Sequence, residues 1–255
     1  MKKFFIVPAN DGEAVEIRKI LSANKVAHIV TRQPWGATWA NLEPEVAQAV
    51  ESFLSANPDA QVHGVELGGP ARWNAINIDH HVYRDENRSN EKSSIEQVAA
   101  LLNIELTRHQ SLIAANDKGY IPALIAAGAT TNEIKIVRAQ DRLSQGVTPD
   151  QEAQAVADIN SAEVRDGKWL VRCPKGATSA ITDRIYGQYS ELITVDGQNG
   201  KWIYFGARHQ EFYALTDGET HARWYGGDPK SGFSGVEKPT SETQAKILNF
   251  FWQEV

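Results

Sequence analysis

The chain has 255 residues, 42% of them hydrophobic, and a formal net charge of -6. This length suits one large domain or two modest ones, and the acidic balance, shared equally by residues 1–150 and 151–255, does not indicate a bulk nucleic-acid-binding surface. The single cysteine, Cys173, excludes an internal disulfide and makes a reducing cytoplasm the expected compartment, and no stretch approaches the roughly 20 apolar residues of a membrane span.

The first half of the chain alternates strand and helix patterns. Residues 4–7 predict a buried strand, and after a turn the apolar spacing from residue 14 onward predicts a helix. The elements expected next are a strand over residues 27–30, a helix over 44–56, a strand over 62–67 and a short buried strand over 75–78. Such alternation indicates an α/β fold with a doubly wound, mostly parallel sheet.

Acidic and imidazole side chains follow three of these strands. Asp11 and Glu13 come after the first, Glu66 lies at the end of the third, and Asp79-His80-His81 directly follows the fourth. Because open α/β sheets bind ligands at the carboxyl ends of their strands, the Asp79-His80-His81 run offers three potential metal ligands, and the carboxylate pair Asp11 and Glu13 could hold a divalent cation. Carboxylate oxygen with neutral imidazole suits Mn²⁺, Fe²⁺ or Zn²⁺ better than Mg²⁺. A turn cap at Asp79, and an acidic helix N-terminus at Asp11 and Glu13, remain open as alternatives.

A polar loop and two capped helices come next. Arg84 and Arg88 in the loop could contact a phosphate or face solvent. Ser93 and Glu96 form a capping-box pattern that begins one helix. A second helix after residue 107 ends near Asp117, which is a further candidate ligand or a residue of the C-terminal turn.

Taken together, these motifs resemble the DHH phosphoesterase superfamily. The signature corresponds to Asp79-His80-His81, and the family's acidic motifs correspond to Asp11–Glu13, Glu66 and Asp117. The resemblance implies hydrolysis of a phosphoester or phosphoanhydride bond with two divalent metals, usually Mn²⁺, with Mg²⁺ as the alternative. It implies catalytic roles for the Asp79-His80-His81 signature, and it implies metal ligands at Asp11, Glu13, Glu66, Asp79, His81 and Asp117, with His80 next to the metals.

Three positions of these metal-ligand motifs depart from the family pattern. Val7 stands where the first motif has a histidine ligand, and Glu13 and Glu66 replace aspartates. The missing histidine at Val7, together with Asp228 in the C-terminal part, motivates a second hypothesis, a non-catalytic relative that binds a nucleotide or a protein. For the enzyme, the charge balance predicts a small substrate such as a nucleotide or short oligonucleotide, not long nucleic acid. The lack of a long apolar stretch makes a membrane an unexpected partner. The oligomeric state stays open.

The C-terminal part has a different character. Following the family, we expect a catalytic domain over residues 1–130, a helical connection over 131–161 and a smaller α/β domain over 162–255, similar to the DHHA1 substrate-binding domain. Strands are expected over residues 168–173, 191–195, 201–206 and 212–215, with a hairpin turn at Asn199-Gly200 and a final helix over 240–253.

A glycine-rich stretch lies near the end of this part. Its glycines could let backbone N–H groups approach an anion, or could form a strand connection. The stretch resembles the family's glycine-rich, His-Pro-containing motif, with Asp228 where histidine is usual. The expected substrate-binding residues are therefore Arg84, Arg88, Gly226, Gly227, Asp228, Gly232 and Gly235.

Overall fold

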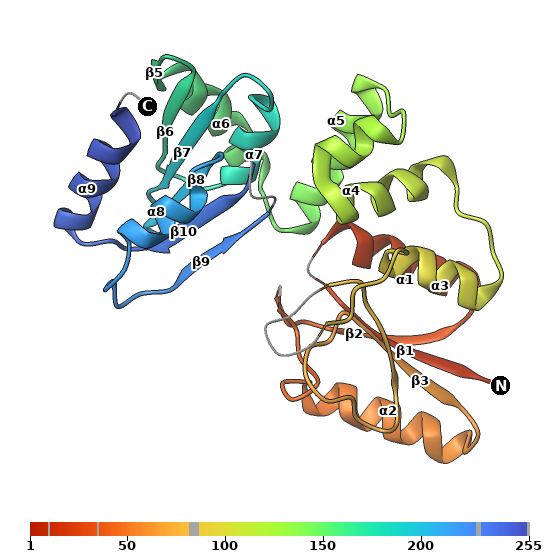
Figure 1. Cartoon of the computed structure of the whole chain (residues 1–255). Coiled ribbons are helices and arrows are strands. Elements are labelled where there is room, and N and C mark those ends of the chain that lie inside the picture. Colours follow the sequence, from red (N-terminus) through yellow and green to blue (C-terminus); the bar gives the residue numbers. More distant parts are fainter. Residues whose placement is uncertain (10, 35, 82–86, 228–230, 254–255) are drawn as a thin grey trace. The chain divides into compact units, whose positions relative to one another are not determined.

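Two separate sheets organise the chain (Figure 1). The computed structural model describes residues 1–255 except 10, 35, 82–86, 228–230 and 254–255. The chain divides into two compact units, Met1–Gly146 and Val147–Val255. The assignment of catalytic and substrate-binding roles to these parts stays a prediction.

The N-terminal unit contains a parallel sheet, as the alternating pattern predicts. Its strand order is β2-β1-β3-β4, and each neighbouring pair runs parallel. The strands are β1 (Lys3–Pro8), β2 (Ala27–Thr31), β3 (Gln61–Val65) and β4 (Ile76–Ile78). The chain moves from β1 to one neighbour through a first helix and then to the other neighbour through a second, so the strand order reverses beside β1. In such sheets the reversal opens a binding crevice at the carboxyl ends of the strands.

Helices cover both faces of this sheet (Figure 1). On β1, Phe5 and Val7 pack in one cluster, and Phe4 and Ile6 pack in the other, because successive side chains point to opposite faces. The helices α1 and α3 cover the first face and α2 covers the second. The helices of this unit are α1 (Gly12–Ala23), α2 (Pro44–Ala56), α3 (Ser94–Leu102), α4 (Arg108–Ala126) and α5 (Thr131–Ser144).

One expectation for this unit is wrong. The strand before Asp79 is not covered on both faces, because β4 is a three-residue strand at the edge of the sheet and Ile76 is 48% exposed. Only Ile78 is fully buried there. Of the apolar run, one residue, Ile78, therefore faces the core, and it fixes the start of the loop after β4.

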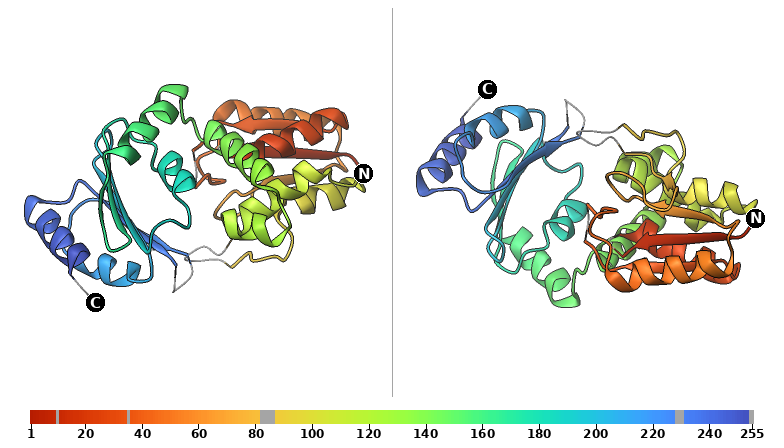
Figure 2. Two further views of the ribbon diagram at one scale, coloured as in Figure 1. Left: turned by 90° about the horizontal axis from the view of Figure 1, so that it is seen from above. Right: turned by 90° about the horizontal axis from the view of Figure 1, so that it is seen from below.

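The C-terminal unit contains a mixed six-stranded sheet, with helices on both faces (Figure 2). The strand order is β5-β6-β7-β8-β10-β9, and β6 and β7 form its parallel pair. Its elements are α6 (Pro149–Asn160), β5 (Glu163–Arg165), β6 (Lys168–Cys173), α7 (Thr178–Arg184), β7 (Glu191–Asp196), β8 (Lys201–Phe205), α8 (His209–Leu215), β9 (Arg223–Gly226), β10 (Phe233–Glu237) and α9 (Ser241–Trp252). The two-unit α/β architecture agrees with the prediction from the sequence.

Two local expectations differ in outcome. The hairpin at Asn199-Gly200 is confirmed, because β7 and β8 pair antiparallel around it and Gly200 has a φ of 69°. The strand expected over residues 212–215 is wrong, because these residues end α8. Phe212 is fully buried and stacks on Tyr204, so packing of one helix face outweighs the strand preference of aromatic residues.

Within the described residues, no helix combines the length and the hydrophobicity needed to cross a membrane. Cys173 is buried and free.

Candidate metal centre

The strand ends of the parallel sheet bring three of the predicted motifs to one edge. Glu66 directly follows β3, the Asp79-His80-His81 signature directly follows β4, and Asp11 begins α1 shortly after β1. The N–H of Glu66 donates to the carbonyl oxygen of Ile78 at 2.9 Å, which ties the first two loops together. Glu66 has a φ of 49°, and this left-handed conformation turns the chain sharply at the end of its strand.

Asp117 enters from the helical layer. It lies in α4 just before an interruption at Gly119 and Tyr120, whose backbone angles are not helical. The first segment of α4 therefore ends next to Asp117. A carboxylate in the last turn of a helical segment is unfavourable for the helix dipole, so this position needs a compensating positive charge.

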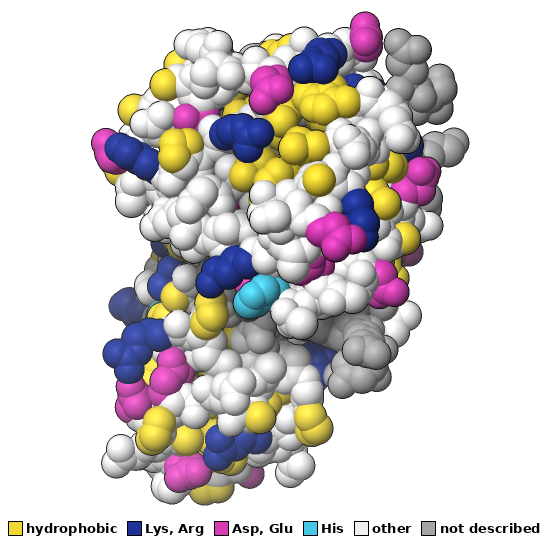
Figure 3. Space-filling model, turned by 90° about the vertical axis from the view of Figure 1, so that its left-hand side faces the viewer, with side chains coloured by type: hydrophobic (Ala, Val, Ile, Leu, Met, Phe, Trp, Pro, Cys, Tyr) yellow, Lys and Arg dark blue, Asp and Glu magenta, His cyan; other side chains and the backbone are white. Residues whose placement is uncertain are grey.

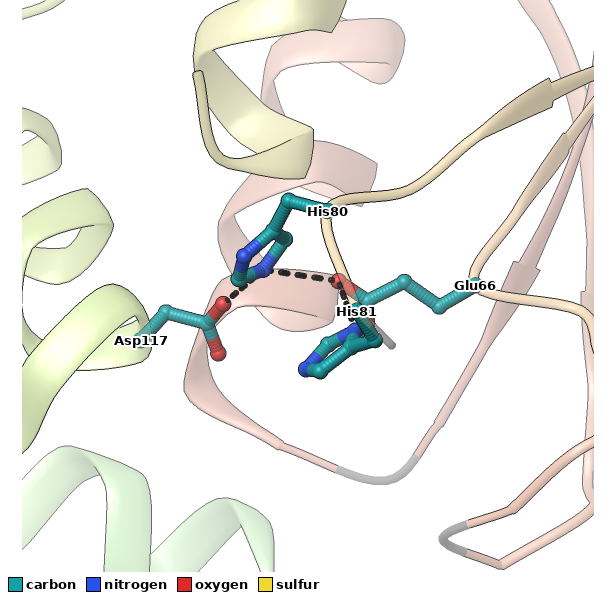
Figure 4. A group of neighbouring side chains, drawn as sticks. All are labelled: Glu66, His80, His81 and Asp117. Carbon is teal, nitrogen blue, oxygen red and sulfur yellow. Dashed lines mark hydrogen bonds and ion pairs between the residues drawn. The ribbon is translucent and has the colours of Figure 1, made fainter. Parts of the chain in front are cut away.

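Four side chains converge to form the centre (Figure 4). Glu66, His80, His81 and Asp117 each offer one ligand atom, and these atoms lie within 4.8 Å of one another. His80 reaches between the two carboxylates, with its Nε2 2.5 Å from Oδ2 of Asp117 and 3.6 Å from Oε1 of Glu66. The Nδ1 of His81 lies 4.0 Å from the same Glu66 oxygen. Two carboxylates and two imidazoles form the donor set expected for a borderline divalent cation.

The electrostatics of the centre favour a positive charge there. Burial alone would lower the pKa of His80, but hydrogen bonds to Asp117 and Glu66, and their charges, raise it to about 10. The pKa of His81 is also raised, chiefly by its hydrogen bond to Asp79. Burial and the charge of Glu66 raise the pKa of Asp117, although its hydrogen bond with His80 opposes this. The carboxylates thus stabilise an imidazolium where a metal ion would lie.

Asp79 lies behind His81 and outside this group of four. Its Oδ1 accepts the backbone N–H groups of His80 and His81, at 2.8 and 3.0 Å, and contacts Nδ1 of His81 at 3.0 Å. Its Oδ2 lies 3.4 Å from the guanidinium of Arg88. Asp79 therefore orients His81 through the backbone N–H and the Nδ1 of that residue.

Asp11 and Glu13 border the centre without joining the group of four. Oδ1 of Asp11 caps α1 by accepting the N–H of Ala14 at 2.7 Å, and Oε1 of Glu13 accepts the N–H of Ile95 at 3.0 Å. Burial and the charge of Glu66 raise the pKa of Asp11 to about 7. Burial, Asp117 and Glu66 raise the pKa of Glu13 well above its usual value.

The donor set fits a divalent cation. The buried Oε2 of Glu13 has no hydrogen-bond partner within the described part of the chain. Its carboxyl group is close enough to those of Asp117 and Glu66 for their charges to disfavour its ionisation. Buried carboxylates that raise one another's pKa are relieved by a bound cation, which favours their ionised form.

Comparisons with known proteins do not identify the chain. No protein-family model matches it, and no curated protein matches it significantly. Among solved structures, the pGpG-specific phosphodiesterase PggH of Vibrio cholerae is similar over 98% of this chain and 97% of its own, with 12% sequence identity and a TM-score of 0.43. At that identity and score, the similarity shows neither a family nor an activity.

Of the two predicted phosphate-binding arginines, Arg88 is described. Its guanidinium donates to the carbonyl oxygens of Leu67 and Gly69, at 2.6 and 2.8 Å, and lies beside Asp79. Arg88 thus joins the loop after β3 to the loop after β4 and contacts protein groups rather than open solvent. Arg84 lies outside the described residues.

The predicted glycine-rich stretch is closely packed in the C-terminal unit. A Cβ on Gly232 would lie 2.6 Å from the carbonyl oxygen of Gly226 and from the His209 ring, and one on Gly227 would lie 2.9 Å from the Cα of Gly232. A Cβ on Gly235 would overlap the indole ring of Trp224. These contacts give a packing reason for the glycines. Their role toward an anion stays a prediction, and Asp228 lies outside the described residues.

Sequence reasoning missed two buried charged residues behind the centre, Arg138 and Asp141 of α5. The signal was present, because both fall on the inward face together with Ile134 and Val137, at the spacing i, i+3, i+4 and i+7. Charged residues on an inward helix face require a partner.

Proposed function

We propose that this chain is a metal-dependent phosphoesterase of the DHH type that hydrolyses a small phosphorylated substrate. The observation that supports this best is the convergence of Glu66, His80, His81 and Asp117 at the carboxyl edge of the parallel sheet. We propose Mn²⁺ as the metal, with Mg²⁺ as the alternative. A bound divalent cation would neutralise phosphate oxygens and lower the pKa of the attacking water.

The side chains divide into two roles in this proposal. Glu66, His80 and Asp117 hold the cation, because Nε2 of His80 lies between the two carboxylates and all three side chains are largely buried. His81 is 36% exposed and is oriented through its Nδ1 by Asp79, so we assign it the transfer of a proton to the leaving oxygen. This exchanges the roles that the family resemblance implies for His80 and His81.

A second cation would be held by the first motif. Asp11 and Glu13 are the nearest further carboxylates, and the orphaned Oε2 of Glu13 supports their taking part. Counting bound metal therefore decides between one and two sites. About two Mn²⁺ per chain would support the dinuclear arrangement, and one would limit the site to Glu66, His80 and Asp117.

The direct test is turnover. The full chain, stripped with a chelator and reloaded with Mn²⁺, is incubated with di- to tetranucleotides, cyclic dinucleotides, nucleotides and pyrophosphate, and products are separated by chromatography. We expect hydrolysis of at least one class, lost on chelation. Asp117→Asn should weaken Mn²⁺ binding at least about 100-fold, or about 2.7 kcal/mol, whereas the surface variant Asp59→Asn should bind like the unmodified chain. Metal-loaded protein without turnover on the whole panel would refute the proposal.

A second function has one observation in its favour. Val7, at the position of the family's first histidine ligand, is completely buried and apolar. A chain without that ligand could bind a nucleotide or a protein without hydrolysing it. Tight binding of a panel compound without conversion would favour this second function.

A further inference from the structure

A buried ion pair on α5 lies behind the metal centre. Arg138 donates to Oδ2 of Asp141 at 2.8 Å, and the side chains are 8% and 10% exposed. Removing two charges from water costs several kcal/mol per ion, so a buried pair is weak evidence for a gain in stability. Its other contacts indicate what it does.

Asp141 contacts the flank of the first motif. Its Oδ1 accepts the N–H of Gly12 at 3.1 Å, at the residue between Asp11 and Glu13. This N–H is one of the donors that the first turn of α1 leaves without a helical partner. A Cβ on Gly12 would lie 3.3 Å from both Cα and Oδ1 of Asp141, so the glycine permits the close approach of α5 to α1.

Arg138 contacts both flanks of the last motif. Its guanidinium donates to Oδ1 of Asn116 at 2.9 Å and lies 4.4 Å from the centroid of the Tyr120 ring. Tyr120 has a φ of 57° and a ψ of -148°, a backbone conformation that costs about 1–3 kcal/mol and persists only where surrounding contacts fix it. Asp117 lies between these two contacts.

We propose that Arg138 and Asp141 form a positioning pair for the metal centre. The pair joins the residue between Asp11 and Glu13 to the residues on either side of Asp117, and so fixes the spacing between carboxylates that enter from α1 and from α4. The inference rests on the proposed function, because it assigns to the pair the task of aligning metal ligands. Neither residue touches the metal or the substrate.

The test is metal binding by the full-length variant Arg138→Gln. Loss of the positive charge removes a Coulomb repulsion of the cation, and this effect alone would strengthen cation binding. Loss of positioning has the opposite sign, and groups that orient ligands are worth about 10- to 100-fold in metal affinity. We therefore expect Mn²⁺ affinity, measured by calorimetry, to fall about 10- to 100-fold, and the visible absorption of the Co²⁺-loaded protein to change.

The matched control is Arg208→Gln in the C-terminal unit. Arg208 forms a similarly buried pair with Glu191, with side chains 16% and 12% exposed, and the control should lower the melting temperature without changing Mn²⁺ affinity or the Co²⁺ spectrum. If Arg138→Gln does not fold, Arg138→Lys replaces it, with Arg208→Lys as its control, because lysine keeps the charge but cannot form the planar contacts.

Three results would overturn the inference. Unmodified affinity and spectrum in the Arg138 variant would refute it while leaving the proposed function intact, and so would an equal loss in the control. An unmodified chain that binds no metal would refute both together.

Discussion

His80 sets how metal binding depends on pH. Its imidazolium lies between Glu66 and Asp117, and its pKa is about 10, so at pH 7 the ring carries the proton that a metal must displace. Binding therefore releases at least one proton, and the apparent Mn²⁺ affinity should rise by up to about tenfold per pH unit below pH 10. Calorimetry of the chelator-treated protein in buffers of different ionisation enthalpy measures the number released. If no proton is released, the His80 ring keeps its proton when the metal binds.

His63 on β3 gives a second pH effect, away from the centre. Both ring nitrogens are buried without a hydrogen-bond partner among the described residues, and the ring stacks on Phe5 at 4.8 Å. Burial, and to a smaller extent the charge of Lys3, lowers the pKa of His63 to about 4. The unfolded chain binds this proton near pH 6.5 and the folded chain only near pH 4. The contribution of neutral His63 to the free energy of unfolding is therefore complete above pH 6.5 and is lost as the pH falls toward 4.

The test of this effect is the variant His63→Phe, which keeps the ring but cannot titrate. Between pH 7 and pH 4.5 the unmodified chain should lose about 2–3 kcal/mol more in free energy of unfolding than the variant does. Urea unfolding at the two pH values measures the difference. Parallel pH dependences would show that His63 contributes nothing.

Among the structural elements, the strand pair β9–β10 offers a test of why Gly235 is a glycine. Gly235 pairs with Trp224 across the two strands, and a Cβ there would overlap the indole ring. We expect Gly235→Ala to destabilise the protein by about 1–3 kcal/mol through overpacking. The same substitution in a Trp224→Leu background should cost much less, and thermal unfolding of the four proteins gives the coupling. An equal cost in both backgrounds would exclude packing against Trp224 as the reason for the glycine.

The elements that sequence reasoning found are those with local signals. Apolar runs predicted the buried strands of both units, and capping residues such as Thr107 mark helix starts in the structure as they do in the sequence. Phe212 was assigned to a strand because a run with aromatic residues favours one locally. The contact with Tyr204, which buries this face of the helix, is not visible in the sequence. The exposed edge position of β4 likewise depends on pairing partners distant in the sequence.

The candidate site was predictable in composition and not in detail. Residues Glu66 and Asp117 were expected because acidic side chains at strand and helix ends are visible in the sequence. The proposed exchange of roles between His80 and His81 rests on which imidazole nitrogen contacts which carboxylate, and no spacing in the sequence encodes that. The contact of Arg138 with the residues around Asp117 is equally invisible, because it joins helices through their tertiary packing.

At the scale of the whole molecule, charge predicts the length of the substrate. Positive and negative side chains are interspersed over the face drawn in Figure 3, and the net charge is -6. Basic residues on and near β5 and β6 have acidic partners or cap a helix: Arg165 and Arg172 lie 3.9 Å from Glu163, Lys175 pairs with Asp150, and Lys168 donates to carbonyl oxygens at the end of α9. This arrangement is not the continuous basic channel that tracks a long strand.

We therefore expect activity to be greatest on di- to tetranucleotides or smaller compounds and to depend weakly on salt. A series of single strands of increasing length, assayed at 50 and 200 mM salt, measures both. A channel contacting six to ten phosphates would lose about 10³- to 10⁵-fold in affinity over that range. Efficient cleavage of long strands with so steep a dependence would refute the small-substrate prediction and leave the phosphoesterase proposal standing.

The separation of the ligand residues along the chain has a further consequence. Glu66 and Asp117 come from distant segments, so a cation between them closes a loop of the polypeptide, as a covalent cross-link would. With a single cysteine, the chain cannot form an internal disulfide. A bound metal ion would then act as a reversible cross-link. Its contribution to the free energy of unfolding is set by the concentration of free cation and is about 2.7 kcal/mol at a hundred times the dissociation constant. Resistance of the N-terminal unit to proteolysis would then report the supply of metal around the protein.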